Sequence, residues 1–356
     1  MDLNPTVTAK APERRHSSDL TGGKVGIMGA GLVGTYIGGL LSAAGRDVVM
    51  VGRGRTQGAI AKNGLTLTHH KLGPQSPEGF LFATDASALA GCSTVVVTVK
   101  SQDTPDAARE LAEHLSEDAL VISFQNSLGN VERLREHLPF RTVLAGVVPF
   151  NVTSPAPGTF HQGTEGALLL ERSTDPRVLE LKSDLETLDR ELDLREDIRD
   201  VQWGKLLLNL NNPLNALHGG SLRSGLSQWS YRRVLARMVV EALRVTDAAD
   251  IHPVATGKVA PKHLPLLLRL PSPLYIPLMD LLLRIDPHAR SSTLDDLEAG
   301  RGSENDHLQG EVVRLGRRHG IDVSTNARVM DALDTAFAAG ASPGMSGRDM
   351  AKAFLR

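Results

Sequence analysis

The chain has almost no cysteine and no excess of charge of either sign. Cys92 is the one cysteine among 356 residues, so no disulfide can form within the chain. This favours a reducing, cytoplasmic location. Lys and Arg number 39 against 41 Asp and Glu, for a net charge of -2. Because the chain has no basic field of the kind that attracts nucleic acid or an anionic membrane, we expect neither as a partner.

The chain also lacks a long uninterrupted apolar run. The first 23 residues contain no apolar core of the kind a signal peptide has, and we expect a flexible tail over 1–23. The most apolar later stretch, 264–285, is interrupted by Arg269, Asp280, Arg284 and several prolines. It falls short of the ~18 apolar residues that a membrane helix needs. We expect short buried helices there, whose apolar faces could form a homodimer interface.

The length and the order of apolar segments predict two domains. A chain of 356 residues is about twice the usual size of one domain. Up to about residue 200, short apolar strands alternate with helices, which predicts a Rossmann-type, doubly wound parallel sheet. The predicted strands are 25–28, 47–53, 93–101, 119–130 and 142–150. Nearly everything after residue 201 is predicted to be helical, so we expect a Rossmann domain over 24–200 and an all-α domain over 201–345.

A glycine turn follows the first predicted strand. It has the pattern GxGxxG and consists of Gly29, Ala30, Gly31, Leu32, Val33 and Gly34. In a dinucleotide site, Gly29 permits the tight turn, Gly31 lets a pyrophosphate approach, and Gly34 lets the helix pack on the strand. The helix then offers its free N–H groups to the phosphates. A purely structural glycine turn is the alternative, but the position between a strand and a helix favours a dinucleotide.

The second strand ends at Arg53, in the sequence VGRGR. NAD sites usually have Asp or Glu at this point, where the carboxylate binds the ribose 2′-OH. Here an arginine can instead bind a 2′-phosphate through charge-assisted hydrogen bonds. The sequence therefore predicts NADPH as the cofactor, and a solvent-facing arginine is the alternative.

Two polar residues follow later strands. Lys100 ends TVVVTVK, and Asn126 lies in FQNSLG. Because strand carboxyl ends line the ligand crevice of an open α/β sheet, both could contact cofactor or substrate. A surface lysine and an asparagine that caps the next turn are the alternatives.

The stretch WGKLLLNLNNPLNAL places polar residues inside a run of leucines. On a helix, Lys205, Asn209 and Asn212 share one face, and leucines surround that face. A buried, unpaired ammonium is costly, so Lys205 should meet a carboxylate, a ligand or water. Pro213 should kink or end the helix. An active-site face is favoured over a solvated one because a cofactor domain precedes it.

A second polar cluster spans 289–306. Ser303 to Asp306 has the pattern S-x-x-D, which predicts a capped helix start. Glu304 either interacts with the helix dipole or faces Lys205 across a cleft. Ser291 and Ser292 could offer hydroxyls to a substrate carboxylate.

In this order, these segments resemble the ketopantoate reductase family, from about Lys24 to Gly340. The resemblance is carried by GAGLVG, Arg53, VTVKSQDT, SFQNSLGN, WGKLLLNLNNPLNAL and ARSSTLDDLEAGRGSEND. It implies a Rossmann domain joined to a helical domain, with the active site between them. It also implies NADPH-dependent reduction of ketopantoate to (R)-pantoate on the route to coenzyme A.

The resemblance assigns roles residue by residue, and no metal site is among them. Lys205 is similar to the catalytic lysine of the family and Glu304 to its partner carboxylate. The implied substrate-binding residues are Asn126, Lys205, Asn209, Asn212 and Ser292. Besides the glycine turn, the implied cofactor-binding residues are Arg53, Lys100 and Asn126.

The chain departs from the family pattern at three points. The second helix asparagine lies one residue closer than usual, so Asn211 competes with Asn212 for its role. Ser127 replaces the glycine of the usual QNG, and Ala289 stands where some members have an asparagine. The change at Ala289 could shift preference among 2-oxo acids. Two alternatives therefore remain: a related NADPH-dependent reductase with another 2-oxo acid substrate, and a non-catalytic NADPH-binding regulator.

Overall fold

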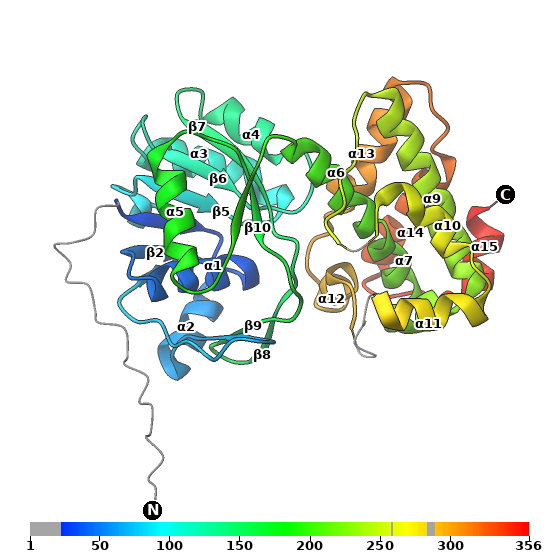
Figure 1. Cartoon of the computed structure of the whole chain (residues 1–356), viewed down its shortest axis with the longest axis horizontal. Coiled ribbons are helices and arrows are strands. Elements are labelled where there is room, and N and C mark those ends of the chain that lie inside the picture. Colours follow the sequence, from blue (N-terminus) through cyan, green and yellow to red (C-terminus); the bar gives the residue numbers. More distant parts are fainter. Residues whose placement is uncertain (1–22, 258, 283–288, 356) are drawn as a thin grey trace, which may run out of the picture.

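The computed structural model describes residues 23–257, 259–282 and 289–355. Figure 1 shows two lobes side by side: an α/β lobe formed by the first part of the chain and a helical lobe formed by the second. The predicted tail lies outside the described residues apart from Gly23. Of the 253–287 segment, residues 253–257 and 259–282 are described.

The α/β lobe is built on an eight-stranded sheet. Its strands are β1 (Val25–Met28), β2 (Val48–Val51), β4 (Leu81–Ala83), β5 (Thr94–Val97), β6 (Leu120–Ser123), β7 (Thr142–Val147), β10 (Leu168–Glu171) and β11 (Leu192–Arg195). Its helices are α1 (Leu32–Ala43), α2 (Gly54–Asn63), η1 (Ala86–Leu89), η2 (Ser101–Asp103), α3 (Thr104–His114), α4 (Asn130–His137) and α5 (Pro176–Glu186). A second sheet consists of β3 (Thr66–His69), β8 (Val152–Ala156) and β9 (Thr159–Gln162).

The main sheet is doubly wound, as predicted. Its order is β11-β10-β7-β6-β5-β1-β2-β4, and neighbours from β4 to β7 pair in parallel. One apolar cluster joins α1 and α5 to the sheet and another joins α3 and α4, so helices cover both faces. This explains why β1, β2, β5 and β6 are buried at every position and consist mostly of apolar residues. Beyond β7 the direction reverses, because β10 pairs antiparallel with β7.

The helical lobe begins at the end of the α/β lobe. Its helices are α6 (Ile198–Asn209), α7 (Asn211–His218), α8 (Leu222–Ser227), α9 (Trp229–Ala248), η3 (Pro261–His263), α10 (Leu264–Leu268), α11 (Ser272–Leu282), α12 (Ser292–Glu298), α13 (Asn305–Arg318), α14 (Ser324–Ala339) and α15 (Gly347–Phe354). The predicted interruption near Pro213 occurs at Leu210, between α6 and α7. Pro213 lies in the first turn of α7, where a missing N–H costs little.

The apolar stretch after residue 263 forms α10 and α11, two short helices separated by a turn. The buried Arg232 of α9 stabilises this turn. Its guanidinium donates hydrogen bonds to the carbonyls of Leu268 and Leu270 at 3.2 and 2.9 Å and lies 4.2 Å from the Tyr275 ring centroid. No helix among the described residues is long and apolar enough to span a membrane.

Several elements between residues 54 and 92 were not predicted. They are α2, β3, β4 and η1, which are short and lack a clear apolar period. Cys92 is buried directly before β5, and burial raises the pKa of its thiol to about 11. It is therefore a packing residue and a poor nucleophile at neutral pH.

Candidate active site

The glycine turn between β1 and α1 leaves room for a ligand at one glycine and none at the other two. Gly29 has φ +100°, and a Cβ there would lie 2.6 Å from the backbone nitrogen of Val99. A Cβ on Gly34 would lie 2.4 Å from Thr98 Oγ1, so α1 can pack this closely only on glycine. A Cβ on Gly31 would meet nothing nearer than the Gly29 carbonyl at 3.9 Å. The space beside Gly31 is therefore open, as a pyrophosphate requires.

The amino end of α1 and the end of β2 can both receive an anion. Among the described residues no side chain caps α1, and its first turn has no acidic residue. Its N–H groups and positive dipole end are thus suited to a phosphate. The Arg53 side chain is 78% exposed, and its guanidinium lies 4.0 Å from the Asp103 carboxylate. Such an exposed pair is weak, so Arg53 can readily bind a ligand.

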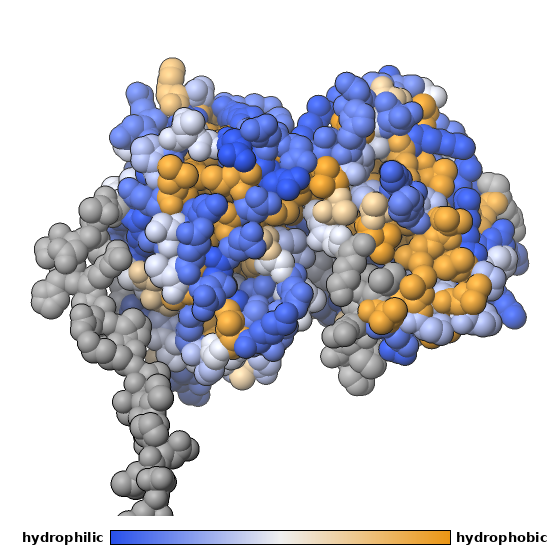
Figure 2. Space-filling view, in the orientation of Figure 1, coloured by the Kyte–Doolittle hydropathy of each residue, from blue (hydrophilic) through white to orange (hydrophobic). Residues whose placement is uncertain are grey.

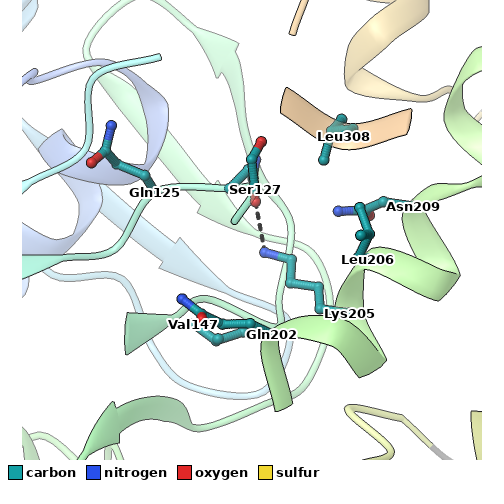
Figure 3. A pocket seen from close by; sticks show the side chains of 9 residues that line it. Gln125, Ser127, Val147, Gln202, Lys205, Leu206, Asn209 and Leu308 are labelled. Carbon is teal, nitrogen blue, oxygen red and sulfur yellow. Dashed lines mark hydrogen bonds between the residues drawn. The ribbon is translucent and has the colours of Figure 1, made fainter. Parts of the chain in front are cut away.

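Lys205 extends from α6 to the carboxyl edge of the main sheet. Its Nζ donates hydrogen bonds to Asn126 Oδ1 at 2.7 Å and to the Val148 carbonyl at 2.5 Å. The dashed line from Lys205 in Figure 3 marks the bond to Asn126. Asn126 follows β6 and Val148 follows β7, so the lysine lies where an open α/β sheet binds its ligands.

The environment of Lys205 favours a role as an acid. Burial lowers the pKa of its ammonium to about 8, and the Glu304 carboxylate opposes this by raising it. A catalytic acid is most effective when its pKa lies near the working pH. Lys205 remains charged at neutral pH but gives up its proton far more readily than a lysine in water.

Glu304 lies on the helical lobe and is bound by the α/β lobe. Its Oε1 accepts hydrogen bonds from the Ser101 backbone nitrogen at 3.1 Å and from Ser101 Oγ at 3.2 Å. In the described part of the chain, Glu304 and Lys205 share no direct hydrogen bond or ion pair. Glu304 therefore acts on Lys205 through its charge, and Ser101 fixes the position of that charge.

The predicted capping box at Ser303 is wrong. Helix α13 begins at Asn305 with Glu304 in the N-cap position, and no side chain of the described residues caps it. Ser303 Oγ instead accepts a hydrogen bond from the Asn305 backbone nitrogen at 3.1 Å. The Glu304 carboxylate does not cap the helix and instead accepts a hydrogen bond from Ser101.

The loop after β6 is held by a network of buried amides and hydroxyls. Asn130 Nδ2 donates to the Asn126 carbonyl at 2.8 Å and to Ser101 Oγ at 3.1 Å. Ser101 Oγ also lies 3.2 Å from Ser127 Oγ. Ser127 has φ +80°, a conformation that favours glycine. The serine in place of the usual glycine is therefore strained, and its hydroxyl joins the network that positions Glu304.

Lys100 connects the two lobes. Its Nζ lies 2.5 Å from Asp296 Oδ2 on α12, and Arg301 Nε donates to the other oxygen of Asp296 at 2.6 Å. The Lys100 and Asp296 side chains are 26% and 12% exposed, so water screens the pair only in part. Lys100 follows β5 as predicted, and its contact with the cofactor stays a prediction.

The asparagines of α6 and α7 have different partners. Asn209 lines the same cavity as Lys205. Asn211 Oδ1 accepts a hydrogen bond at 2.7 Å from the hydroxyl of Tyr231, which is buried. The Asn212 carbonyl accepts one from Ser291 Oγ at 3.3 Å, and Asn212 does not line the cavity. The Asn211 amide oxygen is thus already bonded to Tyr231 within the protein. The substrate contacts of Asn209 and Asn212 stay predictions.

The two serines at the start of α12 differ in exposure. Ser291 is buried and caps α12, because its Oγ accepts a hydrogen bond from the Leu294 nitrogen at 3.2 Å. Ser292 is the exposed first residue of the helix. Its hydroxyl is the more accessible to a ligand, and its contact with the substrate stays a prediction.

A narrow cavity lies between the lobes at Lys205. It is lined by Gln125, Asn126, Ser127, Val147, Gln202, Lys205, Leu206, Asn209 and Leu308. Its free volume is ≈ 10 Å³, about the space that one water molecule needs. A larger ligand can enter only if side chains or lobes move apart. Among the described residues, no group of three or more His, Cys, Asp or Glu side chains could hold a metal ion.

Three residues of this region were not singled out from the sequence. Ser101 follows Lys100 at a strand end, so its position could have indicated it. Gln202 lies one turn before Lys205 on α6, where helical spacing could have suggested it. Asp296 had no sequence signal, because its partner Lys100 lies 196 residues away along the chain.

Two family profiles match the chain, one in each lobe. "Ketopantoate reductase PanE/ApbA" matches residues 25–174, and "Ketopantoate reductase PanE/ApbA C terminal" matches residues 197–336. The chain belongs to the ketopantoate reductase family. It is accordingly an oxidoreductase, and the predicted resemblance is confirmed.

Relatives within the ketopantoate reductase family match over most of their length. The 2-dehydropantoate 2-reductase of Archaeoglobus fulgidus is 29% identical over 324 residues, which cover 86% of this chain and 96% of the relative. That of Halobacterium salinarum is 28% identical over 311 residues, 84% of this chain and 94% of the relative. The structure of a PanE/ApbA family ketopantoate reductase from Ralstonia eutropha has a TM-score of 0.76 and 29% identity, and covers 89% of this chain and 99% of its own.

Proposed function

We propose that this protein reduces the 2-oxo acid ketopantoate (2-dehydropantoate) to (R)-pantoate, with NADPH as the cofactor. The observation that carries the proposal is the position of Lys205. A lysine from the helical lobe reaches the carboxyl ends of β6 and β7, at the same edge of the sheet as the glycine turn after β1. Relatives of the chain are 2-dehydropantoate 2-reductases. The reducing setting favoured by the single cysteine makes the cytoplasm the proposed location.

The residues of the α/β lobe fit a phosphorylated dinucleotide. The open space at Gly31 and the uncapped amino end of α1 would receive the pyrophosphate. Arg53, at the end of β2, would bind a 2′-phosphate through its guanidinium. Lys100 and Asn126, which follow the next strands, would contact the cofactor nearer its reactive end. When bound, NADPH supplies the hydride for the carbonyl carbon of the substrate.

Lys205 acts on the carbonyl oxygen of the substrate. Negative charge develops on this oxygen during reduction, and a positioned ammonium stabilises it and then gives it a proton. Nζ has three N–H donors, of which Asn126 and Val148 accept two, so the third can be donated to the carbonyl oxygen of the substrate. Glu304 raises the pKa of Lys205 and so keeps more of it protonated. Asn209, Asn212 and Ser292 would hold the rest of the substrate.

The first experiment follows NADPH oxidation by absorbance with purified protein and ketopantoate. NADH and other branched, linear and aromatic 2-oxo acids are measured in parallel. We expect fast turnover of ketopantoate with NADPH and a large preference over NADH. Fast reduction of a different 2-oxo acid would replace the substrate and keep the mechanism. Absence of turnover with NADPH still bound would instead support a regulator.

The cofactor preference has a matched pair of variants. Arg53→Ala should raise the KM for NADPH by at least ~10-fold, because it removes a charge-assisted bond to the 2′-phosphate, and should leave that for NADH nearly unchanged. Arg55→Ala removes a second exposed arginine, in the first turn of α2, and should have little effect. Equal losses in the two variants, or equal use of both cofactors by the wild type, would rule out the role of Arg53.

A homodimer is a further part of the proposal. Leu266 on α10 and Leu274 and Leu281 on α11 are 70%, 62% and 67% exposed. Figure 2 shows apolar side chains gathered over this part of the helical lobe. A second copy of the chain would remove these leucines from water. Light scattering after size exclusion should show a dimer that Leu274→Asp converts to a monomer, and a monomeric wild type at micromolar concentration would exclude it.

A further inference from the structure

A larger cavity lies in the helical lobe and shares no residue with the Lys205 cavity. Its volume is ≈ 570 Å³, within the range of about 300–1,000 Å³ typical of small-molecule sites. It is lined by Trp229, Arg233, Arg237, Arg269, Ser324, Thr325, Phe354 and Leu355. We call it the arginine basin. Three guanidinium groups beside two aromatic rings are unusual in a chain whose net charge is -2.

Two of the three arginines are not neutralised. Arg237 pairs with Glu241 at 3.0 Å and with Asp322 at 3.2 Å, so carboxylates already balance it. Arg233 and Arg269 are exposed, and within the described ranges neither has a carboxylate partner. Guanidinium groups are planar forks of donors that match phosphate oxygens. The basin therefore has a net positive charge and the donor geometry for an anion.

The basin also offers a ring surface and a free hydroxyl. Trp229 is 47% exposed, and the Arg233 Cζ lies 4.9 Å from its ring centroid. Aromatic faces bind nucleobases and other planar rings. Thr325 lines the basin, and within the part of the chain that the structure describes its hydroxyl forms no hydrogen bond, so it is free to donate one to a ligand.

The backbone that carries two sides of the basin is held in place by the fold. Trp229 and Arg233 lie one turn apart on α9 and share a face. Arg269 lies in the turn after α10, and the buried Arg232 holds the carbonyls on both sides of it. The fold therefore keeps these three side chains near one another without a ligand.

We propose that the arginine basin binds a nucleoside phosphate at a site separate from the cofactor. The phosphate lies between Arg233 and Arg269 and accepts a hydrogen bond from Thr325, and the base packs on Trp229. Tight binding requires both the phosphate and the base, because the arginines recognise only the anion and the tryptophan only the ring.

The tryptophans allow a direct test. The chain has two, and Trp203 is only 3% exposed, so a ligand in the basin should quench Trp229 alone. The dinucleotide site is first saturated with NADP⁺, and ADP is then titrated while tryptophan fluorescence is followed. We expect saturable quenching by ADP that weakens at high salt. Adenosine and inorganic pyrophosphate should each bind at least ~10-fold more weakly, since each lacks one of the two contacts.

Variants separate this site from unspecific binding. Arg233→Ala combined with Arg269→Ala should weaken ADP binding by at least ~10-fold, with folding checked by circular dichroism. Arg244→Ala, an exposed arginine of α9 outside the basin, is the matched control and should bind as the wild type does. Unchanged affinity in the double variant, or the absence of saturable quenching, would overturn the proposal. Pyrophosphate that binds as tightly as ADP would remove the base from it.

Discussion

The acid role of Lys205 predicts a specific dependence of the reaction on pH. Burial lowers the pKa of Lys205 to about 8, and only the protonated lysine can donate to the substrate oxygen. The kcat/KM for the 2-oxo acid should therefore be constant below pH 7 and fall as pH rises through about 8. One pH unit above this pKa only about a tenth of the lysine is charged, so kcat/KM at pH 9 should be about tenfold lower. An ordinary lysine, with its pKa of about 10.4, would show no loss in this range.

Glu304 provides the second half of this test. Its charge raises the pKa of Lys205, so Glu304→Gln should move the fall in kcat/KM to lower pH. The assay is the oxidation of NADPH at substrate concentrations well below KM, in buffers of constant ionic strength from pH 6 to 10. Lys205→Met should lose at least ~10²-fold in kcat/KM and show no such fall. A wild-type profile that is flat to pH 10, or a fall that Glu304→Gln leaves in place, would refute the reasoning.

Three further predictions concern the same cleft. Ser101→Ala should lower kcat/KM about tenfold, because Glu304 loses one of its two hydrogen bonds to Ser101. Ser101→Thr keeps the hydroxyl and should restore kcat/KM. Equal kcat/KM values for the wild type and both variants would disprove the positioning role. Ser127→Val should lower the free energy of unfolding by about 2 kcal/mol, since a β-branched residue tolerates φ +80° poorly. Ser127→Gly should not lower it, and urea denaturation measures the free energy of unfolding of both variants. The pKa of Lys205 is about 8 in the folded state and about 10.5 in the unfolded chain, so between these pH values the unfolded state binds more protons. The free energy of unfolding of the wild type should therefore rise as pH increases across that window. Lys205→Met should remove this rise and be more stable than the wild type at pH 7 by up to about 3 kcal/mol, and identical denaturation midpoints at pH 7 would contradict it.

The sequence by itself determined the sheet and the glycine turn. Strands such as β1 and β5 are nearly all apolar, and a parallel sheet covered on both faces buries such strands at every position. Gly29 and Gly34 were recognisable because their function depends on local geometry, a positive φ and a close contact between neighbours. The same local logic identified Lys205 as a charge inside an apolar helix.

The partners of the charged groups were decided only by the tertiary structure. Lys205 bonds to Asn126 and Val148, whereas the sequence pointed to Glu304. Glu304 bonds to Ser101, and the cap predicted at Ser303 did not form. The contacts of Lys205 and Glu304 join the two lobes, and their geometry depends on how α6 and α13 pack against strand ends far away in the chain. Local pattern determines which residues are buried or turn the chain, but hydrogen bonds form between groups that the whole fold brings within about 3 Å.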